Sequence, residues 1–312
     1  MQMRSFCQAA GVLPPGLRRA ALALPEEVQE RGEELRLRLG RGMTVSLAGV
    51  EREVPGAGIV RGDDLGAVLE IATQASAHTA LEQVRRGFVT VRGGHRIGLC
   101  GTAAAEGGAV KTLRFLSSVN IRVAREVKGA AGDALPLLRR GTGVASTLIL
   151  APPGAGKTTL LRDLIRALSD GEGGPPLRVG VADERGELAS LWEGRPCLDV
   201  GAHTDVMDGC PKAVGLELLL RGMSPQVLAM DEITAPADAA AAEQAAGCGV
   251  ALLATAHAGT AEDLVRRPLY RGLLERGVFQ KLLTIDLAPT GERTVKVIDL
   301  SELTDGERGV RG

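Results

Sequence analysis

The chain has 312 residues, a length that suits two domains. Hydrophobic residues at 45% and charged residues at 24% indicate a soluble globular protein that can fill sizeable cores. The net charge of −1 excludes a global basic field for nucleic acid or anionic lipid, and 2% aromatic residues leave few platforms for stacking single-stranded bases.

The first 130 residues predict a small mixed α+β domain. Short helices interrupted by prolines come first, strands with period-two alternation follow, and Asp63 is a plausible N-cap for a longer helix. Gly93-Gly94 favours a tight turn between two strands. We expect two helices within 1–30 and one over 63–86, and strands over 34–40, 43–48, 88–92, 95–99 and 113–124.

Glycines and a proline between about residues 127 and 143 predict a domain boundary, which we place after residue 130. Beyond it, short apolar runs alternate with helical stretches, a pattern typical of βαβ units and a parallel sheet. The predicted strands cover 147–150, 177–182, 226–230 and 250–255, and a final pair covers 278–286 and 294–300. Residues 131–312 therefore predict an α/β domain with a parallel sheet.

Residues 147–162 read TLILAPPGAGKTTLLR, the strand–loop–helix context of a phosphate-binding loop. Backbone N–H groups and the helix N-terminus attract phosphates, Lys157 would reach the β- and γ-phosphates of ATP, and the Thr158 hydroxyl would ligate Mg²⁺. The first position of the strict pattern is glycine, and here it is Ala151. The predicted nucleotide-binding residues are Ala151, Pro152, Pro153, Gly154, Ala155, Gly156, Lys157, Thr158 and Thr159.

Two acidic pairs follow predicted strands of the second domain. The run VLAMDE at 227–232 ends in Asp231, expected in the Mg²⁺ shell, and Glu232, expected to orient or deprotonate the attacking water. Asp183-Glu184 follows the strand at 177–182, and we assign Asp183 to the metal and Glu184 to catalysis. The alternative for each pair is helix capping at an ordinary strand end.

His257 follows the predicted strand at 250–255 and could donate a hydrogen bond to the γ-phosphate. By itself this is a weak signal, because a single histidine is more often structural. We expect that structural role for His78, His95 and His203.

Longer runs are more specific than the phosphate loop alone. In the first half they are RRGFVTVRGGHRIGLCG (85–101) and FLSSVNIRVAREVKG (115–129). In the second half they are APPGAGKTTLLRDLIR (151–166), VADERGEL (181–188), DVGAHTDVMDGCPKA (199–213), LLRGMSPQVLAMDEIT (219–234) and TAHA (255–258). Through these runs the chain resembles the stage III sporulation protein AA family of endospore-forming Firmicutes, which is related to the type II and type IV secretion ATPases.

The resemblance implies a RecA-like second domain and a hexameric ring. Lys157 and Thr158 would be Walker A residues, Asp231 and Glu232 Walker B residues, and His257 the histidine box. Asp183 and Glu184 would form the acidic box. In such sheets the strand before the histidine lies between the phosphate-loop strand and the Walker B strand, which would bring His257 beside the γ-phosphate.

The same resemblance implies a motor for a secretion or channel apparatus around the forespore, with membrane proteins as partners. The five cysteines are widely spaced without a CxxC pair, which favours reduced cytosolic thiols. We see no secretory signal and no window of about 20 strongly apolar residues. We therefore expect a mother-cell cytoplasmic protein that meets the membrane through its partners, and no stable nucleic-acid partner.

Thr234-Ala235-Pro236 follows Glu232 where secretion ATPases usually carry an arginine. We therefore consider arginines of the first domain as groups that reach the γ-phosphate of a neighbouring subunit. Solvated sheet faces are the alternative for the same residues. The candidates are Arg96, Arg114, Arg122 and Arg125.

Three functions stay open. The first is the ATPase motor, and the second is a RecA-like, nucleic-acid-dependent ATPase, which the fold permits but the charge and aromatic content disfavour. The third is a nucleotide-gated scaffold with little turnover, against which Glu232 and Glu184 argue as water-activating candidates.

Overall fold

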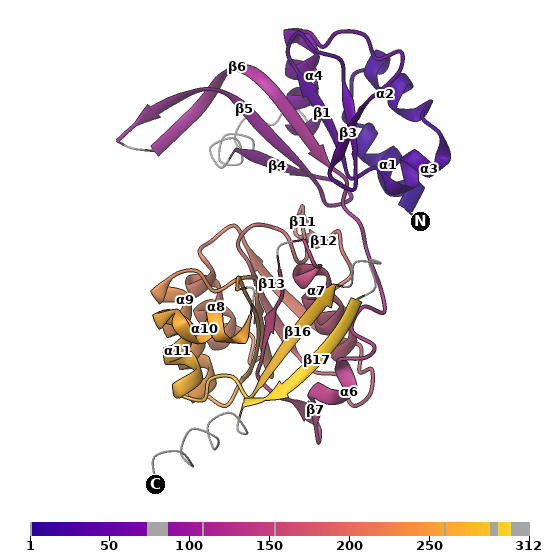
Figure 1. Cartoon of the computed structure of the whole chain (residues 1–312). Coiled ribbons are helices and arrows are strands. Elements are labelled where there is room, and N and C mark those ends of the chain that lie inside the picture. The colour runs from indigo at the N-terminus through magenta and orange to yellow at the C-terminus, as the bar shows by residue number, and fades with distance from the viewer. Residues whose placement is uncertain are drawn as a thin grey trace. The chain divides into compact units, whose positions relative to one another are not determined.

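The computed structural model describes residues 2–73, 87–107, 109–152, 154–258, 260–287 and 293–300 (Figure 1). The chain divides into two compact units. Unit 1 comprises Met1–Glu126 together with Ser190–Leu198, and unit 2 comprises Val127–Ala189 together with Asp199–Gly312. The change of unit after Glu126 lies close to the boundary that we expected after residue 130, whereas the sequence does not indicate that Ser190–Leu198 joins unit 1.

Unit 1 is built on a six-stranded antiparallel sheet with strand order β3-β2-β1-β6-β5-β4. Phe6, Leu35, Leu37, Ile97 and Ile121 are fully buried in its core. The strands are β1 (Glu34–Arg38), β2 (Thr44–Leu47), β3 (Val50–Glu53), β4 (Phe88–Val91), β5 (His95–Glu106) and β6 (Ala109–Arg122). The helices are α1 (Gln2–Ala10), α2 (Pro15–Leu22), α3 (Glu26–Arg31) and α4 (Gly62–Thr73).

Most predicted elements of unit 1 are confirmed. The strands predicted over 34–40 and 43–48 pair as β1 and β2. The two strands predicted around Gly93-Gly94 pair as β4 and β5, with positive φ at both glycines. Strand β3 and a third helix before residue 32 were not predicted. Helix α4 begins where the longer helix was expected, and residues 74–86 of that prediction, with His78, lie outside the described residues.

Unit 2 is built on a seven-stranded sheet with strand order β13-β10-β14-β15-β9-β16-β17, in which all neighbours are parallel except β16 and β17. Figure 1 shows α8 to α11 gathered on one face of this sheet and α7 on the other. Because both faces are covered, central strands such as β9 and β14 are buried along their whole length.

The strands of this sheet are β9 (Thr147–Leu150), β10 (Val179–Asp183), β13 (Thr204–Asp208), β14 (Val227–Met230), β15 (Ala251–Ala256), β16 (Lys281–Leu287) and β17 (Arg293–Asp299). The helices of unit 2 are α6 (Leu135–Leu138), α7 (Lys157–Ser169), α8 (Lys212–Gly222), α9 (Pro236–Gly247), α10 (Ala261–Arg266) and α11 (Pro268–Glu275). Two short strand pairs complete the described chain: β7 (Arg139–Arg140) with β8 (Gly143–Val144), and β11 (Leu191–Trp192) with β12 (Arg195–Pro196), the latter in unit 1. All six predicted strands are confirmed, whereas β13 was missed because its half-buried TDVMD sequence lacks an apolar run.

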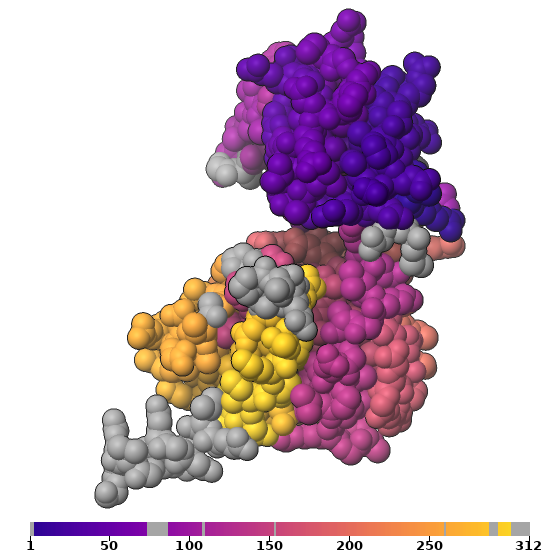
Figure 2. Space-filling model, turned by 45° about the vertical axis from the view of Figure 1, so that its right-hand side comes forward, coloured from indigo at the N-terminus to yellow at the C-terminus, as the bar shows by residue number. Residues whose placement is uncertain are grey.

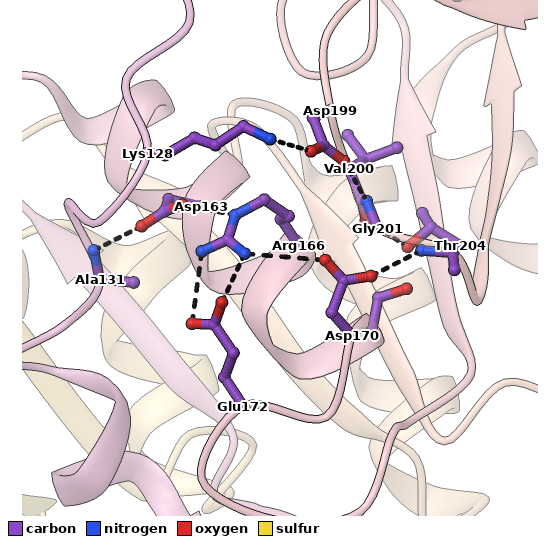
Figure 3. Close-up of polar contacts among 12 residues, drawn as sticks. Lys128, Ala131, Asp163, Arg166, Asp170, Glu172, Asp199, Val200, Gly201 and Thr204 are labelled. Carbon is purple, nitrogen blue, oxygen red and sulfur yellow. Dashed lines mark hydrogen bonds and ion pairs between the residues drawn. The ribbon is translucent and has the colours of Figure 1, made fainter.

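A buried arginine anchors the C-terminal half of α7 (Figure 3). The Arg166 guanidinium donates to Glu172 at 2.6 Å and to Asp163 at 2.8 Å. Both hydrogen bonds raise the pKa of Arg166 above its usual range, and the bond to Glu172 has the larger effect. Asp163 also accepts the backbone N–H of Ala131 at 2.8 Å. The helix is thereby tied to the segment that enters unit 2.

Among the described residues, no helix combines the length and the apolar character that crossing a membrane would require.

We predict a pH-dependent stability of unit 1 that originates at His95. This side chain is fully buried, its Nδ1 accepts the backbone N–H of Ala124 at 3.0 Å, and burial lowers its pKa from 6.5 to about 4. Between these values only the unfolded chain binds the proton, so the free energy of unfolding should fall by about 3 kcal/mol as the pH drops from 6.5 towards 4.

Urea unfolding followed by the fluorescence of Trp192, the only tryptophan and part of unit 1, measures this effect. In His95→Asn an amide oxygen can replace Nδ1 as acceptor, but the side chain no longer titrates. The variant should lose most of the pH dependence over this range. Equal pH dependence in wild type and variant would show that His95 is not its origin.

Candidate functional site

The loop between β9 and α7 has the backbone of a phosphate-binding loop. Gly154 and Gly156 have φ values of 77° and 90°, a region that favours glycine, and Gly156 is the N-cap of α7. The N-terminus of this 13-residue helix presents unpaired N–H groups and a positive dipole end. Ala151 is 2% exposed and does not share the positive φ of the glycines, so alanine is accommodated at this position without backbone strain.

The other predicted nucleotide-binding residues lie around this phosphate-binding loop. Lys157 Nζ donates to the carbonyl oxygen of Ala151 at 2.7 Å, with the Pro152 oxygen at 3.4 Å, so the ammonium lies over its own loop. Ala155 is buried and Thr159 is half-buried in the first turn of α7. Pro153 lies outside the described residues.

Asp231 connects the phosphate loop to two neighbouring strands. The Thr158 hydroxyl donates to Asp231 Oδ2 at 2.9 Å, and the buried Thr255 hydroxyl donates to Asp231 Oδ1 at 2.7 Å. Thr255 Oγ1 in turn accepts the backbone N–H of Glu232 at 2.8 Å. A threonine hydroxyl beside a strand-end carboxylate, next to a phosphate nest, is a set of oxygen donors that suits Mg²⁺ bound with water and phosphate oxygens.

Glu232 occupies a strained backbone position at the same sheet edge. Its φ is 43°, which costs a residue other than glycine of the order of 1–3 kcal/mol. The carboxylate is one-third exposed, and His257 Nδ1 lies 3.9 Å from its Oε1. The expected strand order is confirmed, because β15 lies between β9 and β14 and delivers His257 to the edge that carries Glu232.

The loop after Glu232 is held by the only tyrosine of the chain. Tyr270 on α11 is buried, and its hydroxyl donates to the carbonyl oxygen of Ile233 at 2.5 Å. Burial raises the pKa of this phenol above its usual range, which keeps the hydroxyl a donor. Sequence reasoning missed this contact, because nothing local marks Tyr270 as a partner of residue 233.

The two residues of the second acidic pair, Asp183 and Glu184, lie in different environments. Asp183 is 2% exposed, and its two oxygens accept the backbone N–H groups of Glu187, Leu188 and Ala189 at 2.8, 3.1 and 2.8 Å. Through these bonds the Asp183 carboxylate holds the backbone of the loop that follows β10. Glu184 is 41% exposed and faces Lys212 at 3.5 Å.

Lys212 is a site residue that sequence reasoning missed. It is buried at the start of α8, and its Nζ lies 3.5 Å from Glu184, 3.7 Å from Asp238 and 3.4 Å from the Thr234 hydroxyl. A lysine in the first turn of a helix opposes the helix dipole, and this was the available signal. Its charge is compensated here by the acids around it.

The two acidic pairs share one cavity of about 30 Å³, which has room for a water molecule. The ends of β10 and β14 meet there because these strands are parallel neighbours. The lining residues are Ala182, Asp183, Glu184, Arg185, Glu187, Lys212, Asp231 and Glu232. The sequence-predicted acids are thus brought together, as a parallel sheet requires.

Two histidines lie outside this site. His95 is buried in unit 1, and a ring nitrogen of His203 contacts the carbonyl oxygen of Ser169 at 2.8 Å, in keeping with the structural roles expected for both.

The family model described as "Sporulation stage III, protein AA" matches residues 7–300. The chain belongs to this family. It is also similar to stage III sporulation protein AA of Bacillus subtilis (strain 168), with 38% identity over 292 residues that cover 93% of this chain and 94% of the relative.

Solved structures show which fold the stage III sporulation protein AA family has. The Legionella pneumophila ATPase DotB is similar with a TM-score of 0.55 at 14% identity, over 90% of this chain and 83% of that one. The pilus retraction motor PilT with bound ADP is similar with a TM-score of 0.58 at 18% identity, over 87% and 80% of the two chains. The fold is therefore that of the P-loop secretion ATPases, as the sequence predicted.

We predict that the Thr255 hydroxyl is required for the stability of unit 2. Thr255→Val keeps the shape but removes both the donor to Asp231 and the acceptor for the Glu232 N–H, which leaves polar groups unpaired in a buried site. The free energy of unfolding should fall by about 1–3 kcal/mol. Thr255→Ser retains the hydroxyl and serves as the control. Chemical unfolding followed by far-ultraviolet circular dichroism measures the difference, and equal losses in the two variants would contradict the prediction.

Proposed function

We propose that this chain is a magnesium-dependent ATPase of the secretion-motor type that energises the assembly of, or transport through, a channel between mother cell and forespore. The observation that carries the proposal is the hydrogen bond from Thr158 to Asp231, 2.9 Å long. It joins the first turn of α7 to the residue that follows β14, across the intervening strand β15. A nucleotide-binding site needs this pair for its metal, and a glycine-rich turn alone does not.

Each residue has a proposed role in ATP hydrolysis. Gly154, Gly156 and the N-terminus of α7 would hold the phosphates, and Thr158 and Asp231 would hold Mg²⁺. When bound, the metal supplies positive charge that offsets the charge developing on the phosphate oxygens. Glu232 orients the attacking water and accepts its proton, as its partial exposure and its position beside Asp231 allow.

Lys157 must change partners when ATP binds. Its ammonium now donates to the carbonyl oxygen of Ala151, and we propose that it exchanges this bond for the β- and γ-phosphates. His257 lies 3.9 Å from Glu232 and is half-exposed, so it is available to donate to the γ-phosphate. Loss of that phosphate on hydrolysis would then break a hydrogen bond made by His257, just after the end of β15.

The acidic box completes the site in this proposal. Glu184 shares the small cavity with Glu232 and is the second candidate for polarising the attacking water. Asp183 was predicted as a metal ligand, and the three backbone bonds that it accepts support instead a positioning role for Glu184 and the loop. A contribution of Asp183 to the metal shell would have to replace one of these bonds.

The wider setting is also proposed. Membership of a sporulation family supports a place in the mother-cell cytoplasm against membrane-protein partners, and the motor-like fold supports a hexameric ring.

We predict that Lys157 and Glu232 affect different steps. Lys157→Ala should weaken binding of a fluorescent ATP analogue because a phosphate contact is lost. Glu232→Gln should bind it normally but release phosphate at least about 100-fold more slowly, because the general base is removed. Glu217→Gln is the matched carboxylate control, because Glu217 lies on the surface of α8 and its ion pair is with Arg221 on the same helix. Unchanged turnover in Glu232→Gln would remove its catalytic role, and binding without turnover in the wild type would support a nucleotide-gated scaffold.

We predict that the ATP-bound state favours membrane partners over nucleic acid. Glu232→Gln, loaded with ATP, should co-sediment with membranes from sporulating Bacillus subtilis cells and much less with membranes from vegetative cells. Labelled single-stranded DNA should show no salt-dependent binding to the same protein. Strong DNA binding with no preference for sporulating membranes would favour the nucleic-acid-dependent ATPase instead.

A further inference from the structure

The C-terminal hairpin of unit 2 extends the sheet beside the strand that carries the phosphate loop. Strand β16 is parallel to β9, with Lys281 opposite Thr147 and Thr284 opposite Leu150. Strand β17 returns antiparallel to β16, with Arg293 opposite Leu287. Figure 1 shows the two strands side by side. Arg293 is therefore about three residues, or roughly 10 Å, beyond the end of β9, on the side where the phosphate loop begins.

The Arg293 side chain lies directly against this loop. A Cβ atom built on Gly156 would be 2.8 Å from Arg293 Nη1, 3.1 Å from Cζ and 3.3 Å from Nη2. Three atoms at nearly equal distances place the guanidinium plane over the backbone of Gly156. Gly156 therefore serves two needs, the left-handed backbone and the close approach of an arginine.

With respect to the described residues, the position of this arginine is electrostatically unfavourable without a ligand. A cation at a helix N-terminus opposes the helix dipole, and Lys157 adds a second positive charge one residue further on. Over the part of the chain that the structure describes, Arg293 makes no ion pair with a carboxylate. Two cations and the positive end of α7 thus converge on one loop, which is the environment that a polyphosphate would neutralise.

We propose that Arg293 binds the phosphate chain of the nucleotide in the same subunit, from the Gly156 side of the loop. This inference rests on the proposed ATPase function and adds a phosphate-binding residue to it. The planar guanidinium can donate two parallel hydrogen bonds to phosphate oxygens, which the Lys157 ammonium cannot do. Because Arg293 begins β17, the contact also connects the nucleotide to the hairpin at the edge of the sheet.

Three of the four arginines that the sequence suggested for phosphate contact have other partners. Arg96 lies over the ring of Phe88 at 3.7 Å, and Arg122 donates to Glu34 at 3.0 Å. Arg125 donates to the carbonyl oxygen of Gly32 at 2.7 Å. All three contacts are within unit 1, whereas Arg293 is already beside the loop of its own chain.

The test compares Arg293→Ala, Arg293→Lys and wild type for the affinity of ATP and ADP and for KM and kcat of hydrolysis. Arg293→Ala should weaken ATP binding about tenfold or more, because a charge-assisted pair of hydrogen bonds is lost. Arg293→Lys should recover part of this loss. Lys296→Ala is the matched control, because Lys296 is on the same strand, is exposed and, among the described residues, pairs with Asp286 alone. Strand β17 itself is on the surface of unit 2 (Figure 2). The unfolding midpoint of each variant shows whether the strand still folds.

The outcomes separate this inference from the proposed function. If wild type and Lys157→Ala bind ATP equally weakly, the proposed function itself fails. If Lys157→Ala behaves as proposed while Arg293→Ala binds ATP within twofold of wild type, only the role of Arg293 is overturned. Tighter binding by Arg293→Ala also overturns it, because the arginine would then block the loop.

Mixing subunits tests whether the contact is made within one chain. Arg293→Ala subunits retain Lys157, and Lys157→Ala subunits retain Arg293. If Arg293 acts in its own subunit, a mixture of the two variants should show no more activity than the average of the separate proteins. Recovery of turnover in the mixture would show that Arg293 acts on a neighbouring subunit and would overturn the assignment.

Discussion

The carboxylate of Asp231 is the point on which the site depends. One oxygen accepts the hydroxyl of Thr158, at the start of α7, and the other accepts the hydroxyl of Thr255, at the end of β15. The same Thr255 oxygen accepts the N–H of Glu232. Three elements that are far apart in the chain are thus held within hydrogen-bond distance at one sheet edge. A metal shell requires this degree of positioning, because small displacements of a ligand change its coordination.

The strained backbone at Glu232 is maintained by its surroundings. Its N–H is bound by Thr255, and the next residue is held by the Tyr270 hydroxyl. These contacts outweigh the cost of a positive φ at a glutamate and aim its carboxylate towards the cavity shared with Glu184. Strain of this kind, held on both sides by buried hydrogen bonds, is typical of a site that must keep one side chain in one direction.

Charge is balanced separately on the two sides of the site. Lys212 compensates the acids at the ends of β10 and β14, and its burial makes that compensation strong. Lys157 and Arg293 lie instead at the phosphate loop, where Lys157 donates to carbonyl oxygens of the loop. The acidic side suits a metal and a water, and the basic side suits phosphates. An Mg–ATP complex has the matching distribution of charge.

Local sequence patterns are enough to predict several parts of this protein. The run GAGKTT predicts a phosphate loop because glycines adopt its backbone most readily and a helix start supplies N–H groups. The run VLAMDE predicts a buried strand that ends in acids. The alternation of strands and helices also predicts a parallel sheet, whereas the place of β15 between β9 and β14 was implied by the family resemblance. Tertiary structure alone decided that Lys212, Tyr270 and Arg293 join the site and that Ser190–Leu198 belongs to unit 1. The reason is that these contacts join residues tens to more than a hundred positions apart, and such pairs are set by how strands and helices pack, which no short stretch of sequence specifies.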